Sequence, residues 1–223
     1  MGLGWLGRPI GLLKNALPCW PRGRRANGRS GDNLLARFRA WTPELRHLLA
    51  ADILTRTCEG MSEMFAVLYM MNIVGLGPLQ FGTLITVKAL FAILAYLPAG
   101  PLAERWGRFP LVLTTFLFFA AFPIAVWATQ GYLTALLAFV IGGLREFGEP
   151  ARKALITDLG GGGRDYGLYY LLRGLSVAPA ALIGGWLWQQ APWLPFVVAG
   201  CVGVCAVFFY AAFHPSRNGN TLR

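Results

Sequence analysis

Residues 50–73 read AADILTRTCEGMSEMFAVLYMMNI, which is long enough for a transmembrane helix but carries four charged side chains. These are Asp52, Arg56, Glu59 and Glu63, spaced four, three and four residues apart. At 100° per residue, this spacing confines them to an arc of roughly 60° on one helix face. We therefore expect the segment to cross the membrane with a charged face turned toward other helices or water.

The rest of the chain has the composition of a membrane protein. Of its 223 residues, 56% are hydrophobic and 13% are charged, and its mean hydropathy is +0.51. A soluble domain carries about a quarter charged residues, so the composition excludes a soluble enzyme. Gly- and Pro-containing breaks separate six apolar stretches, at 50–73, 81–99, 111–128, 132–148, 166–188 and 194–213. We predict an all-α membrane protein with six transmembrane helices in residues 48–213, a basic N-terminal segment at 1–47 and a tail at 214–223.

The basic residues predict the orientation of these stretches. Sixteen of the twenty Lys and Arg residues lie before the first stretch, after the second, after the fourth and in the tail. The other three breaks contain none. The positive-inside rule therefore predicts a multi-pass protein of the cell (inner or plasma) membrane with both termini cytoplasmic. This pattern places Arg152 and Lys153 in a cytoplasmic loop. It also explains the net charge of +10 without a nucleic-acid partner.

The remaining charges lie within the apolar stretches, where each costs about 2.5–3.5 kcal/mol if it faces lipid near the helix centre. Beyond the first stretch they are Lys88, Arg145, Glu146 and Arg173, with Glu149 near the inner surface. We expect Glu63 to pair with Lys88, and Glu59 to contact Arg145 or Arg173. The third and sixth stretches carry no charge, so we expect them on the outside against lipid, with the others around a polar cavity.

Glu59 is the best candidate for a proton-binding site. It lies roughly 14 Å along the helix from Ala50, near the middle of a ~30 Å hydrocarbon core, where small rearrangements of nearby charge switch a carboxylate. Gly60 beside it indicates either a locally loosened helix or close helix packing. Pro150 predicts a kink after Glu149, at the cytoplasmic end of the fourth stretch.

Other chemistries find little support in the residue pattern. The cysteines form no CxxC pair, the two histidines lie outside the apolar stretches, and no Gly-x-Ser-x-Gly motif is present. The glycines at 160–163 are followed by Arg164 and Asp165 rather than by the Lys-Ser/Thr of a phosphate-binding loop. We therefore expect no enzyme activity, metal or cofactor, and we expect Cys201 and Cys205 to be small packing residues on one helix face.

Residues 100–109, GPLAERWGRF, are similar to the G-x-L-A-[DE]-R-x-G-R-[RK] signature between the second and third helices of a major facilitator superfamily (MFS) half, and depart from it only at Phe109. Residues 143–156 and 174–185 also resemble members of this family, the former the fourth helix of bacterial drug-efflux-like members. The resemblance implies a cytoplasmic gating loop that stabilises one transport state, formed by Gly100, Glu104, Arg105, Gly107 and Arg108.

The resemblance further implies the architecture and the activity. MFS members have twelve spans in two halves, each of two inverted three-helix repeats, and this chain resembles the C-terminal half with the central loop at 1–47. It implies a permease, or half of one, that moves a small solute by alternating access coupled to protons. Lipid, the solute and a second six-helix half, as a separate chain or a second copy, would be its partners. The pathway residues would be Arg56, Glu59, Glu63, Lys88, Arg145, Glu149 and Arg173. The alternative is a non-transporting membrane subunit or truncated remnant with structural ion pairs only.

Overall fold

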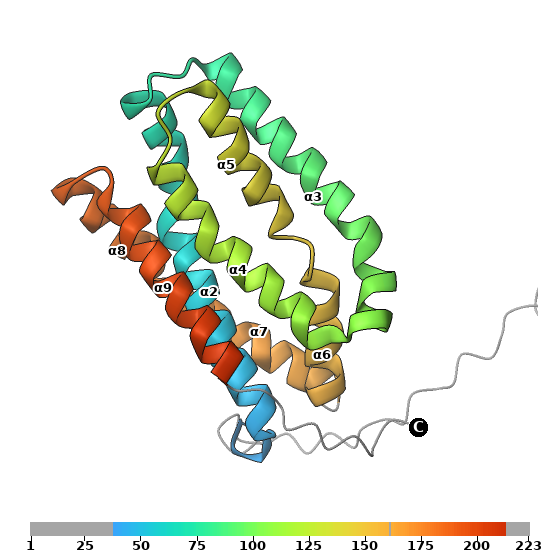
Figure 1. Cartoon of the computed structure of the whole chain (residues 1–223). Coiled ribbons are helices and arrows are strands. Elements are labelled where there is room, and N and C mark those ends of the chain that lie inside the picture. Colours follow the sequence, from blue (N-terminus) through green and yellow to red (C-terminus); the bar gives the residue numbers. More distant parts are fainter. Residues whose placement is uncertain (1–37, 161, 213–223) are drawn as a thin grey trace, which may run out of the picture.

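A computed structural model describes residues 38–160 and 162–212, which fold into helices joined by short turns (Figure 1). This confirms the expected all-α class for these residues. The elements are α2 (Pro43–Leu68), the π-helical η1 (Tyr69–Ile73), α3 (Pro78–Trp106), α4 (Arg108–Trp127), α5 (Tyr132–Leu144), α6 (Glu149–Gly160), α7 (Gly163–Val177), α8 (Ala180–Gln190) and α9 (Leu194–Ala212).

Four helical segments among the described residues are long and apolar enough to cross a membrane. They are α3, α4, α9 and the segment Gly163–Gln190, which joins α7 and α8 across a turn at Ala178 and Pro179. Helix α2 has 26 residues but carries the charged face, and α5 has 13 residues, fewer than the about 20 that a span needs. A count of six spans therefore stays a prediction.

Local interactions determine where α2 begins and how it continues. The Thr42 side chain accepts a hydrogen bond from the Leu45 N–H at 3.3 Å, and Pro43 occupies the first helical position, where a missing N–H costs nothing. A Cβ on Gly60 would lie 3.0 Å from the Cβ of Ala180. Because α2 is unbroken around Gly60, this glycine allows close packing against α8 and does not loosen the helix.

The structure corrects the expected cytoplasmic loop at residues 100–109. Helix α3 continues through Gly100, Glu104 and Arg105 to Trp106, and the junction with α4 is Gly107 alone, with φ of +85°. The residues between Pro101 and Gly107 are mostly good helix formers, so the helix is not interrupted. Only Gly107 has the conformational freedom for the left-handed geometry that ends it.

A second correction concerns the cytoplasmic end of the fourth stretch. Helix α5 ends at Leu144, a turn spans residues 145–148, and α6 begins at Glu149. The expected kink is therefore found, but it begins four residues before Glu149. The loop predicted to hold Arg152 and Lys153 is instead α6, because Pro150 suits the first turn of a helix.

The third and sixth stretches, α4 and α9, each bury one face in the described bundle and expose large apolar side chains such as Leu117 and Phe208 on the other, so their contact with lipid stays a prediction. Helices α4 and α9 pack against each other and against α2, whereas α3 and α8 flank this group (Figure 1). Half of the most apolar 18-residue window of α4 is buried, compared with 11% of the corresponding window of α3. Without charges to accommodate, α4 and α9 can bury side chains such as Phe116, Phe119 and Tyr210 in the core.

Candidate functional site

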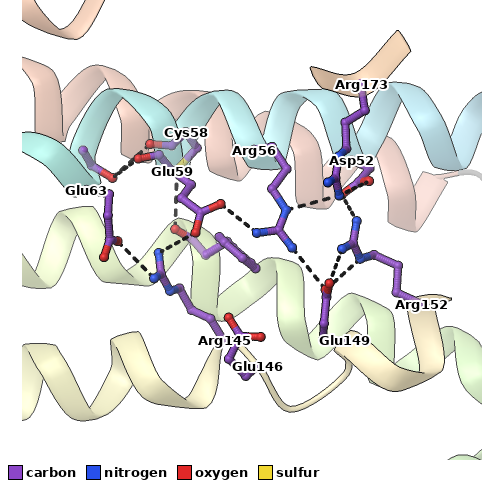
Figure 2. Close-up of polar contacts among 12 residues, drawn as sticks. Asp52, Arg56, Cys58, Glu59, Glu63, Arg145, Glu146, Glu149, Arg152 and Arg173 are labelled. Atoms are coloured by element: carbon purple, nitrogen blue, oxygen red, sulfur yellow. Dashed lines mark hydrogen bonds and ion pairs between the residues drawn. The ribbon is translucent and has the colours of Figure 1, made fainter. Parts of the chain in front are cut away.

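Nine charged residues form a continuous row of ion pairs in which cations and carboxylates alternate, and we call this row the charge chain; Figure 2 labels all of them except Lys88. In order of contact its members are Arg173, Asp52, Arg152, Glu149, Arg56, Glu59, Arg145, Glu63 and Lys88. Helix α2 supplies four of the nine members, because its charged residues share one face. The other members come from α3, α6, α7 and the turn after α5.

The first part of the charge chain is fully enclosed. The side chains of Asp52 and Arg152 are each 1% exposed and form an ion pair. Arg152 also donates from Nε to Glu149 Oε2 at 2.9 Å, and the Tyr169 hydroxyl donates to Asp52 Oδ2 at 3.0 Å. Arg173 approaches the same Asp52 oxygen at 3.4 Å. These contacts join α2, α6 and α7 through buried and neutralised charges.

Two members of this part, Glu149 and Arg152, lie on α6, between the fourth and fifth apolar stretches. Burial lowers the pKa of Arg152, but Asp52 and Glu149 outweigh it and raise the pKa above its ordinary value. Burial likewise raises the pKa of Glu149, but the cations Arg152 and Arg56 outweigh it and lower the pKa. Both side chains are therefore held in their charged forms.

The middle of the charge chain borders an open pocket of about 430 Å³ between α2 and the α7–α8 segment. Arg56 bridges two carboxylates here, with Nη1 2.7 Å from Glu59 Oε2 and Nη2 3.1 Å from Glu149 Oε2. The Glu59 side chain is 24% exposed, in contrast to the enclosed Asp52. The lining residues are Arg56, Glu59, Gly60, Arg173, Gly174, Val177, Ala178 and Ala181.

The last part of the charge chain is organised by Arg145, in the turn after α5. Its side chain is 3% exposed, and Nη2 lies 3.0 Å from Glu63 Oε2 while Nη1 lies 3.7 Å from Glu59 Oε1. Lys88 of α3 forms an ion pair with the other Glu63 oxygen. The Arg145 guanidinium also lies over the Phe122 ring, at 4.6 Å from its centroid, a geometry that stabilises a cation away from water.

The sequence-based pairing was largely correct. The Glu63–Lys88 pair is confirmed, and of the two partners proposed for Glu59, Arg145 is the one in contact. Arg173 pairs with Asp52 instead. Glu146 lies in the turn after α5 and accepts a hydrogen bond from the Tyr96 hydroxyl at 3.0 Å.

The charge chain also contains residues that sequence reasoning missed. Arg152 was assigned to a loop because of its basic charge, and Asp52 was not singled out as a pathway residue. One signal was present. Glu149 and Arg152 are three residues apart after a proline, and in a helix beginning there they lie on one face.

The expected gating residues occupy the junction between α3 and α4. Glu104 and Arg105 are exposed in the last turns of α3. Arg108, the first residue of α4, forms an ion pair with Asp158 of α6. Phe109, which departs from the family signature, stacks on Tyr210 of α9 at 4.7 Å between ring centroids. The junction is therefore held to α6 and α9 by one exposed ion pair and one aromatic contact.

The cysteines of the described residues lie on α2 and α9. Cys201 and Cys205 are exposed on α9 and line one apolar pocket with Ile124 and Trp127; they therefore lie on one helix face, and their role as packing residues stays a prediction. Cys58 is buried in α2. Within residues 38–160 and 162–212, no cluster of three or more His, Cys, Asp or Glu side chains is arranged to hold a metal ion.

Comparisons with known proteins agree with this geometry. None of the curated proteins compared with the chain matches it significantly. The profile of the Major Facilitator Superfamily matches residues 48–222, which include the charge chain, the α3–α4 junction and all four apolar spans. Members of this family are multi-pass membrane transporters, surrounded by lipid, that move small molecules. The chain belongs to the Major Facilitator Superfamily.

Proposed function

We propose that the chain is one half of a secondary active transporter that moves a small solute by alternating access, coupled to protons. The observation that carries the proposal is the charge chain at the open pocket between α2 and the α7–α8 segment. Charged side chains at membrane depth are costly unless they serve a pathway or one another. Here the exposed part of the row, at Glu59, meets a pocket large enough for a small solute.

The proposal requires a second six-helix body opposite the pocket, and we place this chain as the C-terminal half. In this arrangement α2 and residues 132–148, which are α5 with the turn after it, are the spans that complete six, in two inverted three-helix repeats. Large apolar side chains exposed on α3 and α8 support a further helical partner or lipid at these faces, among them Leu79, Ile93, Leu97, Leu182 and Trp186. Both termini would be cytoplasmic in the cell membrane, as the basic residues predict.

Glu59 is the proton-binding residue in this proposal. Its partners Arg56 and Arg145 come from α2 and from the turn after α5, so loss of its charge would loosen the contact between these elements. Arg108, with Glu104 and Arg105 nearby, would form the cytoplasmic gate. Separation of Arg108 from Asp158 would release α4 from α6.

The test is proton movement into vesicles that contain the chain, the membrane proteins of its source and a pH-sensitive dye, after addition of a panel of anionic, cationic and neutral solutes. We expect at least one solute to drive proton movement. Glu59→Gln should abolish this movement, whereas Glu44→Gln, at an exposed position on the same helix, should not. Solute-driven proton movement that is equal in wild type and Glu59→Gln would remove Glu59 from the pathway.

The alternative is a non-transporting subunit or remnant, and the enclosed pair of Asp52 and Arg152 is the observation that favours it. Buried ion pairs of this kind join helices without any need to move. A chain that folds stably in vesicles but moves no solute of the panel, alone or with the membrane proteins of its source, would favour this alternative.

A further inference from the structure

Arg173 has hydrogen-bonding capacity at the pocket that the charge chain does not use. It lines the pocket, and its one contact with a carboxylate is the 3.4 Å approach of Nη1 to Asp52. A guanidinium carries five N–H donors. Arg56 also lines the pocket, but its Nη1 and Nη2 donate to Glu59 and Glu149, and its buried Nε lies 3.9 Å from Asp52 Oδ1. The partly used guanidinium of Arg173, with Arg56 beside it, forms an anion site of the kind that binds carboxylates.

Arg145 does not belong to this anion site. It is almost fully buried and does not line the pocket. Its Nε donates to the Gly142 carbonyl at 3.0 Å, and its Nη2 donates to Glu63 at 3.0 Å. Arg145 therefore holds the carboxylates of α2 in place, and Arg173 remains for a ligand.

The other side of the pocket is apolar and built from small residues. Val177, Ala178 and Ala181 of the α7–α8 segment line it, with Gly60 and Gly174 beside them. A volume of about 430 Å³ is within the range of small-molecule sites. A ligand that satisfies both sides has an anionic head and a short apolar body.

On the basis of the transport function proposed above, we infer that the solute is a small organic carboxylate. Its head accepts hydrogen bonds from Arg173 and, when Glu59 is protonated, from Nη1 of Arg56, and its apolar body packs against Val177 and Ala181. This assigns a substrate class to the pocket and a binding role to Arg173, beyond its ion pair with Asp52.

The same geometry couples the carboxylate to a proton. Arg56 donates from Nη1 to Glu59 at 2.7 Å, so the charged form of Glu59 competes with the ligand for this guanidinium. Protonation of Glu59 removes the competing charge and leaves Arg56 to the ligand. By linkage the proton and the carboxylate favour each other's binding. The other titratable or charged groups facing Glu59 are Cys58 and Glu63 on α2, Arg145 after α5, Glu149 on α6 and Arg173 on α7.

The experiment measures equilibrium binding of radiolabelled benzoate to the full chain in detergent, with neutral benzamide as the isosteric competitor. We expect saturable binding of benzoate that excess benzamide does not displace. Affinity should rise as the pH is lowered from about 8 to about 5. Arg173→Gln should weaken binding by about tenfold or more, whereas Arg164→Gln, an exposed arginine on the same helix, should leave it unchanged.

A second variant keeps the inference falsifiable if Arg173→Gln does not fold. Ala181 is exposed at the pocket and makes no ion pair, so Ala181→Phe should fill the space and abolish benzoate binding without altering any charge. No saturable benzoate binding, displacement by benzamide, or equal binding in wild type and Ala181→Phe would overturn the anion site.

These outcomes are separable from failure of the transport function itself. Solute-driven proton movement in vesicles that only cationic or neutral solutes produce would refute the carboxylate assignment and leave transport standing. Binding of benzoate with the expected pH dependence, but without proton movement for any solute, would support the anion site and refute transport by this chain.

Discussion

Asp52 and Arg152, one hundred residues apart in the chain, form an ion pair in which both side chains are almost completely shielded from the surroundings. The pair joins the first described helix to α6, and each partner has a second contact of opposite charge or a hydroxyl. Removal of one partner from such a pair leaves an uncompensated buried charge, which is more costly than the loss of the whole pair. This asymmetry can be measured.

Arg152→Leu is expected to lower the free energy of unfolding in detergent by about 3–5 kcal/mol, because Asp52 and Glu149 lose their main buried cation. The double variant Asp52→Asn with Arg152→Leu should lose less than the sum of the two single changes. Lys153→Leu is the matched control, since that side chain is half exposed, and should change stability by no more than about 0.5 kcal/mol. A similar loss for the Arg152 and Lys153 variants would show that the buried ion pair makes no special contribution to the free energy of unfolding.

Glu149 predicts an acid-side loss of stability. Although burial raises its pKa, Arg152 and Arg56 lower it below the ordinary value of 4.5. A carboxyl whose pKa is lower in the folded state stabilises the fold above its unfolded pKa and loses this contribution as pH falls. The unfolding temperature, measured from neutral pH down to about pH 3, should therefore fall less steeply in Glu149→Gln than in wild type. Parallel curves for the two proteins would contradict the prediction.

Lys88 and Arg145 share Glu63 but should differ in what their loss costs. Lys88→Met leaves Glu63 with Arg145 and a partly exposed carboxylate, so the expected loss is about 1 kcal/mol. Arg145→Met leaves Glu59 and Glu63 both without this central cation and also removes the contact with Phe122, so about 3–5 kcal/mol is expected. Chemical unfolding of the two variants checks the order, and a larger loss for Lys88→Met would contradict it.

Arg108 and Asp158 should influence transport more than stability. Their side chains are 40% and 54% exposed, so Arg108→Asp should cost at most about 1 kcal/mol. If the pair holds the α3–α4 junction to α6 in one transport state, this variant should change the rate of solute-driven proton movement, and the exchanged variant Arg108→Asp with Asp158→Arg should restore it. An unchanged rate in Arg108→Asp would exclude the pair from the gate.

Periodicity predicted the contacts that depend on one helix face, and missed those that depend on how helices turn and pack. The spacing of Asp52, Arg56, Glu59 and Glu63 was sufficient to place them together and to predict the pair with Lys88. The positive charge of Arg152 predicted a cytoplasmic loop. The positive-inside rule reports the side of the membrane, and it does not report that a helix resumes after the four-residue turn at 145–148. Sequence separation of a hundred residues gives no spacing from which its contact with Asp52 could be derived.

The lateral arrangement of the helices was the least predictable feature. The absence of charge in α4 and α9 predicts lipid exposure, and both helices also pack against α2, so which of their side chains face lipid stays a prediction. Apolar composition alone does not distinguish a side chain that faces lipid from one that faces a neighbouring helix, since both environments exclude water. The length of the α3–α4 junction was not predictable either, since a glycine between two helices indicates a turn but not how many residues the turn contains.

The alternation of the charge chain has a consequence for movement. Each interior member touches two neighbours of opposite sign, so a small displacement of the turn at residues 145–148 along α2 allows Arg145 to exchange Glu63 for Glu59. No charged side chain needs to lose all of its partners at once, so the energy barrier to this movement is divided into several small steps. The same contacts that resist separation of the helices therefore allow Arg145 to move along α2 between Glu59 and Glu63.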